Sequence, residues 1–348
     1  MSKSRAVLTA AVLGCSLACS MGVFAEQAEP ETPIENAFQL GLIVQDTNGD
    51  QLADAVCGHV VVPSSSTAAE NTAAANLAAR IGYETTALTL PIVVEGSVQP
   101  GKGCAAEKAS LWVGRAALAA SAALADKETD EFQIGEGGVF AVPGGLVFVG
   151  VDPAGLLAAA DAYSAHAPYQ WSTTGEKLQA IARMINERLT AQNVAAKVEL
   201  VGVTYQSAQP GIRRVVLQVT GSAGRSAVEK ALTSAEGEPP LRNVHAREVK
   251  LVFTDGTGLL LGGGGNGPGV NATAASPVPA AGAEDEESSE PVLLDLHQLY
   301  GIHGLLKGSP KKLVPDTVAA KLYVPAGEAG IQMANLAARM GLETTGIT

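Results

Sequence analysis

The chain has 348 residues, of which 47% are hydrophobic and 17% are charged, and its formal net charge is −12. This length predicts two or three domains with cores of their own. The acidic charge disfavours capture of nucleic acid or of an anionic membrane surface. Aromatic residues make up 4% of the chain, which argues against a platform of rings that stacks on sugars.

The N-terminus resembles a secretory signal peptide. Lys3 and Arg5 precede an apolar run from Ala6 to Phe24, and an acidic, proline-containing stretch follows Ala25. We expect cleavage after Ala25 (signal peptide 1–25) and export to the periplasm, the cell surface or the medium. Two alternatives stay open. Cys15 follows Val-Leu-Gly as in a bacterial lipobox and could carry a lipid, or the apolar run could remain as an uncleaved anchor.

Export would leave two cysteines, Cys57 and Cys104, in an oxidising compartment. A bridge between them would close a loop of about 47 residues and contribute about 4 kcal/mol in the chain-entropy model. The alternative is a pair of free thiols, because the sequence does not show whether the two residues approach each other.

An aspartate-rich stretch before the first predicted strand has the ligand spacing of a calcium loop. Ca²⁺ takes roughly six to eight oxygen ligands, and the stretch resembles the short calcium loops of extracellular repeat proteins. Gln51 stands where the turn favours glycine, and Cys57 stands where a bidentate glutamate would close the loop, so a solvated acidic turn is the alternative. The candidate ligands are Asp46, Asn48, Asp50, the main-chain carbonyl of Leu52, and Asp54.

Residues 35–172 predict an α/β domain in which strands and helices alternate. A polar loop from Asp126 to Glu131 follows its second helix, and we expect a solvated turn there rather than paired catalytic carboxylates. The predicted elements are a strand over 56–62, a helix over 67–81 closed by Gly82, a strand over 86–94, a strand over 111–113, a helix over 116–125, a hairpin over 139–151 and a helix over 153–165 capped by Asp152.

Three stretches, His59–Val94, Leu111–Gly114 and Leu146–Ala165, carry a resemblance to a known family. They hold a strand, a helix with an AA-x-x-LA run, an ETT turn, an LPIV strand, a WVG strand, a GG-LVFVG hairpin and a helix opened by D-x-AG. This order resembles the small non-catalytic α/β domain that precedes the barrel in glycoside hydrolases of the hexosaminidase and α-glucuronidase type. In those enzymes the catalytic carboxylates lie on the barrel, so the resemblance implies an accessory role.

Residues 173–258 predict a second unit. Thr173 and Glu176 have the spacing of a capping box before an apolar helical stripe. Two strand-like runs, a short helix and a last strand over 244–254 follow. The order α-β-β-α-β predicts a ferredoxin-like domain, a scaffold that hosts many functions.

Residues 259–292 predict a disordered linker, because glycine, proline, alanine and acidic residues cannot bury enough apolar surface to offset the entropy of ordering. Gly262, Gly264 and Gly267 fit the pattern G-x-G-x-x-G. Pro268 and Gly269 follow where a phosphate-binding turn needs a helix, so we assign no nucleotide site.

Residues 293–348 begin a second copy of the first domain. NLAARMGLETTGIT at 335–348 repeats NLAARIGYETTALT at 76–89, with ten of fourteen positions identical, and DTVAAKLYVP at 316–325 parallels DAVCGHVVVP at 54–63. In both copies an arginine and a glutamate four residues apart predict a local ion pair.

This second copy stops before counterparts of the later strands. Half a layer would expose the apolar face of its helix and an unpaired strand edge. We therefore expect a truncated product or incomplete gene model of a longer protein, with completion by another chain as the alternative.

The sequence offers no matched set of nucleophile, base and stabilising donor, so we assign no catalytic residue, and no cofactor beyond the candidate Ca²⁺. Two classes of function fit. The first is a non-catalytic accessory region of a larger exported protein that acts on glycan or cell-wall polymer, with the catalytic part elsewhere. The second is a modular envelope binding or structural protein without catalysis. Carbohydrate or further C-terminal domains are the expected partners, and contact with a membrane would occur only through a lipid at Cys15.

Overall fold

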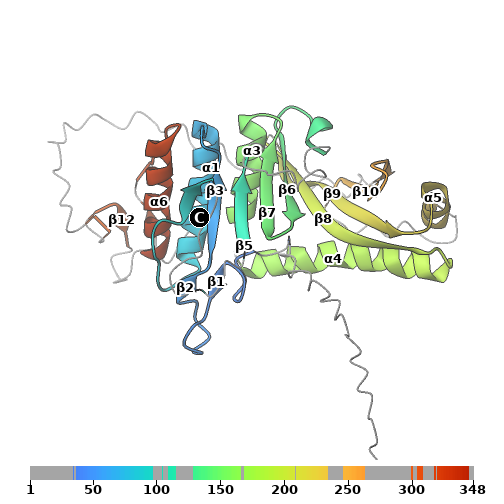
Figure 1. Ribbon diagram of the computed structural model, residues 1–348, viewed down its shortest axis with the longest axis horizontal. Helices are drawn as coiled ribbons and strands as arrows, with labels where there is room; N and C mark the ends of the chain where they lie inside the picture. Colours follow the sequence, from blue (N-terminus) through green and yellow to red (C-terminus); the bar gives the residue numbers. More distant parts are fainter. Residues whose placement is uncertain are drawn as a thin grey trace, which may run out of the picture.

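The computed structural model describes residues 34, 37–96, 104, 109–114, 128–165, 168–207, 209–233, 246–262, 299–300, 304–308, 317–318 and 320–344. They form a mixed α/β fold built on a nine-stranded sheet (Figure 1), which confirms the predicted class. The predicted signal peptide, the helix over 116–125 and nearly all of the linker lie outside the described residues.

The nine strands lie side by side in the order β11-β10-β9-β8-β6-β7-β5-β3-β4. β3 pairs in parallel with β4 and β5, β7 with β5, and β10 with β9, while the other pairs are antiparallel. The strands are β3 (Gly58–Val62), β4 (Val93–Glu95), β5 (Ala109–Val113), β6 (Glu136–Val142), β7 (Gly145–Gly150), β8 (Ala196–Gln206), β9 (Gln209–Gly221), β10 (Glu248–Phe253) and β11 (Gly258–Gly262).

Two short ribbons lie outside the sheet, and they occupy corresponding places in the two copies. β1 (Val44–Gln45) pairs with β2 (Ala55–Val56), and β12 (Leu306–Lys307) pairs with β13 (Thr317–Val318). Each ribbon precedes a helix that belongs to the repeated sequence. The structural repeat therefore begins earlier in the chain than the NLAAR motif.

α1 and α3 begin where their capping residues predict. Thr67 and Glu70 form a capping box on α1, and Asp152 accepts a hydrogen bond from the N–H of Gly155 at 2.8 Å at the start of α3. The helices are α1 (Ala68–Tyr83), α3 (Pro153–Ala165), α4 (Pro168–Ala191), α5 (Arg225–Thr233) and α6 (Glu328–Leu342).

The sheet is buried on both faces. One face packs against α1, α3, α4 and α5 in the main core. Alternate residues of the central strands form a second apolar cluster on the opposite face, which explains why β6 and β7 read as continuous apolar runs. Its buried members are Phe132, Phe140, Val142, Val147, Val149, Val216 and Val252.

Several predicted boundaries were wrong. The strand expected over 86–94 is reduced to the three residues of β4, and residues 85–92 form coil. Gly82 does not end α1, which continues to Tyr83, and the missing side chain of Gly82 instead lets α6 approach. Thr173 does not cap α4, which begins five residues earlier at Pro168. β11 was missed, and it covers the first residues assigned to the linker.

The predicted order α-β-β-α-β appears as α4-β8-β9-α5-β10, but these strands extend the sheet of the first unit through the antiparallel pair β6 and β8. In a split β-α-β unit another strand lies between the two parallel strands. Here β9 and β10 are direct neighbours. What the structure shows is one mixed sheet shared by both predicted units.

The helix of the second copy, α6, lies beside α1 at the end of the sheet that β4 forms (Figure 1). The expected bare helix face was wrong for α6. Its inward residues are buried because they contact α1 and β4, and they include Ile331, Ala334, Asn335, Ala338 and Met340. The segment before it, which corresponds to β3, forms no described strand, and Tyr323 is 84% exposed.

Candidate functional site

In the loop between β1 and β2, backbone N–H groups fix the side chain of Asp46, the first predicted calcium ligand. Asp46 accepts hydrogen bonds from the N–H groups of Asn48, Gly49 and Gln51 at 3.1, 2.6 and 2.8 Å. These bonds, that from Gln51 foremost, hold the pKa of Asp46 below its ordinary value of 3.8. The carboxylate is therefore ionised at neutral pH and fixed in orientation.

The remaining predicted ligands lie in the same loop. Asp54 accepts hydrogen bonds from the N–H and the hydroxyl of Thr47 at 2.8 and 2.9 Å, and Asp50 accepts one from the N–H of Leu52 at 2.9 Å. Gln51 adopts a φ of 69°, the left-handed conformation for which glycine was expected. The five candidate residues thus share one largely exposed turn.

In the part of the chain that the structure describes, no three His, Cys, Asp or Glu side chains are grouped so as to hold a metal ion. The predicted calcium set also includes the amide oxygen of Asn48 and the carbonyl oxygen of Leu52. Calcium binding here stays a prediction, and so does the solvated turn.

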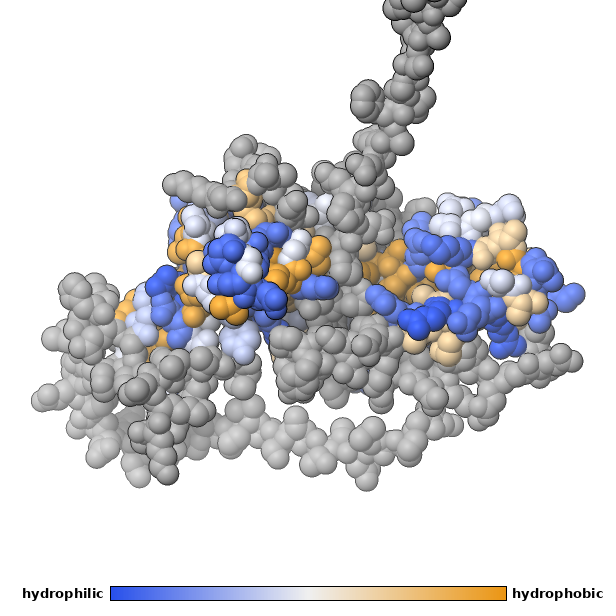
Figure 2. Space-filling model, turned by 90° about the horizontal axis from the view of Figure 1, so that it is seen from below, coloured by the Kyte–Doolittle hydropathy of each residue, from blue (hydrophilic) through white to orange (hydrophobic). Residues whose placement is uncertain are grey.

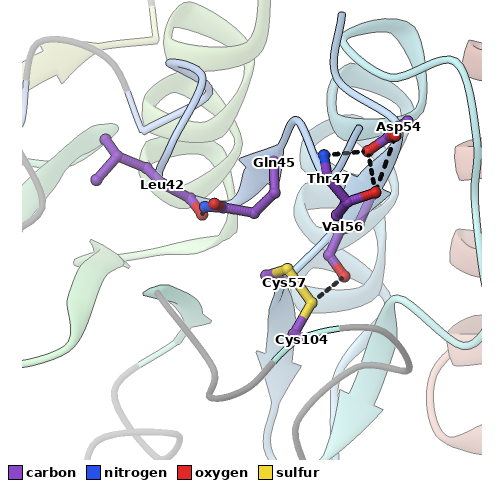
Figure 3. The surroundings of a disulfide bond; sticks show 7 residues. All are labelled: Leu42, Gln45, Thr47, Asp54, Val56, Cys57 and Cys104. Atoms are coloured by element: carbon purple, nitrogen blue, oxygen red, sulfur yellow. Dashed lines mark hydrogen bonds between the residues drawn. A yellow bond between two sulfur atoms is a disulfide. The ribbon is translucent and has the colours of Figure 1, made fainter. Parts of the chain in front are cut away.

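The predicted bridge between Cys57 and Cys104 is present, with the two Cα atoms 5.6 Å apart. Cys57 precedes β3, and its N–H donates to the carbonyl oxygen of Ile43 at 2.7 Å. The bridge lies close to the contact between Thr47 and Asp54 (Figure 3). The disulfide and the acidic loop therefore stabilise the same corner of the first copy.

The two repeat helices contact each other through equivalent residues, the numbers in α6 being 259 higher than in α1. A Cβ on Gly82 would lie 1.9 Å from the carbonyl oxygen of Ala338, and one on Gly341 would lie 2.0 Å from the carbonyl oxygen of Ala79. Gly82 corresponds to Gly341 and Ala79 to Ala338, so the contact is reciprocal. Only glycine permits so close an approach of two backbones.

Asn335 of α6 closes the edge of the sheet at β4. Its Oδ1 accepts hydrogen bonds from the N–H groups of Ile92 and Val93 at 2.7 and 2.9 Å, and its Nδ2 donates to the carbonyl oxygen of Val93 at 3.0 Å. The amide thus takes the place of a neighbouring strand. Its counterpart Asn76 instead donates to Asp161 on α3.

Both predicted ion pairs are confirmed. Arg80 binds Glu84, and Arg339 binds Glu343. Arg80 is 4% exposed and also donates to the carbonyl oxygen of Ser164 at 3.1 Å, whereas 41% of the Arg339 side chain is exposed. The same motif therefore serves a buried contact in one copy and a surface contact in the other.

No family model, curated protein or solved structure matches this chain. The contacts of its own residues are consequently the basis on which its function can be inferred.

A largely buried charged cluster on β6, β8, β9 and β10 was missed in the sequence. Glu136 is fully buried, accepts a hydrogen bond from the hydroxyl of Thr204 at 2.9 Å, and lies 3.2 Å from Nε of Arg213. Arg214 binds Glu248 at 3.0 Å beside them. Two adjacent arginines in a predicted strand were the one available signal. Two cations offset two anions here, which suits a structural network.

The solvated turn predicted over Asp126 to Glu131 was wrong for Glu128, whereas Asp130 and Glu131 are exposed as expected and Asp126 lies outside the described residues. Glu128 is 2% exposed and its Oε1 lies 2.7 Å from Nζ of Lys250, which also contacts Glu131 at 2.7 Å. Lys250 lies on the strand face that carries the second apolar cluster. A lysine inside a predicted strand gave no indication of its partner, because the two residues are 122 positions apart.

An open groove runs between α4 and β8. Asn186 on α4 pairs with the backbone of Val198, accepting from its N–H at 2.7 Å and donating to its carbonyl oxygen at 2.9 Å. Other lining residues are Arg183, Glu187, Lys197 and Glu199. Hydrophilic residues cover much of the described surface at this end of the molecule (Figure 2). The mixed charges of the groove indicate no particular ligand.

Proposed function

We propose that this chain is a non-catalytic structural module of an exported protein, in which copies of an α/β unit associate side by side. The observation that carries this proposal is the packing of α6 on α1; we call the surface of α1 that α6 covers, around Asn71, Ala75, Ala79 and Gly82, the seat. Corresponding residues of the two copies face each other across it, with Gly82 against Ala338 and Gly341 against Ala79. A repeat that packs on its own counterpart is a unit suited to assembly.

Two further features support association of copies. The ribbon that precedes each helix recurs, as β1-β2 in the first copy and β12-β13 in the second. Asn335 satisfies the backbone of β4, so the second copy also protects an edge of the first copy's sheet. Helix pairing and edge protection act at the same junction.

Export is part of the proposal. The N-terminal 25 residues have the pattern of a signal peptide, and disulfides persist in oxidising compartments, so the bridge between Cys57 and Cys104 supports the same location. In the described part of the chain, no helix is long and apolar enough to cross a bilayer. Lipid attachment at Cys15 stays the alternative to release by cleavage.

A second candidate is an accessory region of a larger exported protein that acts on glycan or cell-wall polymer. The order of elements on which the resemblance to glycoside hydrolase accessory domains depends is present as β3-α1-β4-β5-β6-β7-α3. This observation favours a likeness in architecture. It gives no ligand, and the α4 groove has no aromatic side chain among its lining residues.

One experiment separates the two candidates. The purified mature chain is incubated with peptidoglycan and with insoluble glycans, and both release of soluble fragments and co-sedimentation are measured. A structural module of associated copies should neither release fragments nor sediment with polymer. Co-sedimentation without release would favour the accessory region, and release of fragments would overturn both.

A further inference from the structure

The first turns of the two helices differ although the rest of their shared face is alike. The face of α1 carries Asn71, Ala75, Ala79 and Gly82, and the corresponding face of α6 carries Gly330, Ala334, Ala338 and Gly341. Three of the four positions match, with alanine or glycine in both helices. Asn71 and Gly330 are the exception.

Asn71 is fully buried and reaches into the junction. Its Nδ2 donates to the carbonyl oxygens of Pro325 and Gly327 at 2.8 and 3.0 Å, just before and at the N-cap of α6. Its Oδ1 is buried without a hydrogen-bond partner. A buried amide that is only half satisfied costs stability, and such residues are known to select the register and partner of paired helices.

The space that Asn71 occupies is open only because position 330 is glycine. A Cβ on Gly330 would lie 2.2 Å from Nδ2 of Asn71 and 1.9 Å from the carbonyl oxygen of Pro325, which accepts a hydrogen bond from that amide. If a second α1 took the place of α6, its own Asn71 would stand at this position and its Cβ would collide with the amide. A shift of α6 by one turn would bring the methyl group of Ala334 to the same place. Asn71 therefore admits a helix with glycine in its first turn.

Building on the proposed association of copies, we propose that Asn71 is the residue that selects the partner of α1. Because of Asn71, the seat on α1 accepts an α6 helix, from the same chain or from another molecule of this protein, and rejects the α1 helix of another molecule. Pairing is then between unlike copies, which gives an array of such units a direction.

The test uses the full mature chain carrying Gly341→Leu, in which the added side chain displaces the chain's own α6 from the seat. Two fluorescent peptides of equal length serve as probes, residues 325–344 and residues 66–85. Their binding to the vacant seat is measured by anisotropy. We expect the 325–344 peptide to bind about tenfold more tightly than the 66–85 peptide, because the latter loses two hydrogen bonds and meets a clash.

Adding Asn71→Gly to this chain should bring the two affinities within about threefold of each other. Thr72→Gly is the matched control, since it places the same residue one position away, where the side chain bonds only to the carbonyl oxygen of Ala68; it should leave the preference intact. Equal binding with Asn71 present, an unchanged preference after Asn71→Gly, or no binding of either peptide would overturn the inference.

The proposed association of copies is judged separately, by hydrogen exchange of α6 in the unmodified chain and in the Gly341→Leu chain. Protection of the α6 amides that is lost on Gly341→Leu supports the helix pair even where the peptides show no selectivity. Lack of protection in the unmodified chain would count against the pair itself.

Discussion

The C-terminal halves of α1 and α6 carry nearly the same sequence, yet the two helices lie in different surroundings. α1 covers the sheet and packs against α3, while α6 lies beyond α1 at the β4 edge. Their mutual face is alike in both beyond the first turn, where Gly82 and Gly341 each face the backbone of the other helix. The remaining shared residues take roles that their positions decide, as Asn76 and Asn335 show.

The helix starts differ in the same way. α1 has a capping box of Thr67 and Glu70, whereas α6 begins at Gly327 without a side-chain cap. The N–H of Gly327 instead donates to the carbonyl oxygen of Ser66 at 2.9 Å. The N-terminus of α1 is therefore stabilised by side chains of its own copy, whereas the N-terminus of α6 is stabilised by a contact with the first copy. Substitutions at matched positions of the two copies test this contrast.

The largest difference should come from the disulfide, which the first copy alone possesses, because Ala319 stands where the aligned second copy would have Cys57. Replacing both Cys57 and Cys104 by serine should lower the free energy of unfolding by about 4 kcal/mol, since the bridge closes a long loop in the unfolded chain. Urea unfolding of the oxidised mature chain and of the double variant measures the loss. Equal midpoints and slopes would contradict a stabilising bridge.

The next contrast is between the two asparagines. Asn335→Ala should cost about 3 kcal/mol, because it leaves the N–H groups of Ile92 and Val93 and the carbonyl oxygen of Val93 without these partners in a buried place. Asn76→Ala, the matched control, removes one exposed hydrogen bond to Asp161 and should cost less than about 1 kcal/mol. Thermal unfolding compares them. Similar losses for the two variants would argue against closure of the sheet edge by α6.

The arginines should follow the same order with a smaller effect. Arg80→Ala removes a buried guanidinium that binds Glu84 and the carbonyl oxygen of Ser164, and should cost about 2 kcal/mol. Arg339→Ala removes a half-exposed ion pair and should cost under about 1 kcal/mol. The same unfolding assay measures both. A larger loss of stability for Arg339→Ala than for Arg80→Ala would contradict the assignment of the buried, stabilising ion pair to the first copy.

Much of the fold follows from local sequence. The hairpin turns at Pro143 and Gly144, α3 begins after Asp152, and the strands over 56–62 and 111–113 appear because apolar runs end at strong turn signals. β4 was overestimated because the LPIV run looks like a strand, although only its end pairs with β3. Periodicity predicts an element better than it predicts how much of that element pairs.

The candidate site was less predictable. The repeat itself was visible, and so were both ion pairs, since each lies within five residues. The roles of Asn335 and Asn71 were not visible, because their partners lie more than 240 positions away in the chain. The burial of Glu128 against Lys250 was not predicted for the same reason, since the two residues are 122 positions apart. A single sequence shows which residues can form such contacts, but the fold decides which of them meet.

The two ribbon loops offer a further contrast. The first carries Asp46, Asp50 and Asp54, whereas the corresponding stretch of the second, GSPKKLVPD, holds two lysines. Calcium at several times a dissociation constant of about 10⁻⁴–10⁻³ M should stabilise the chain by about 1 kcal/mol. Asp50→Ala should abolish both this shift and the heat of binding in calorimetry. Equal heats in the two proteins would remove calcium and leave the solvated turn.

The smallest effect concerns Asp161, the partner of Asn76. Desolvation beside α1 raises the pKa of Asp161 above its ordinary 3.8, and the hydrogen bond from Asn76 opposes this. A carboxyl group with a raised folded-state pKa favours folding fully below pH 3.8, and that contribution is lost as pH rises through the folded-state pKa. Asp161→Asn, which cannot ionise, should therefore gain stability relative to the native chain across this window and keep a constant small advantage at neutral pH. Urea unfolding between pH 3.5 and 8 measures the difference, with Ala162→Asn as the control. If the native chain instead gained stability over Asp161→Asn as the pH rises, the hydrogen bond from Asn76 would outweigh desolvation.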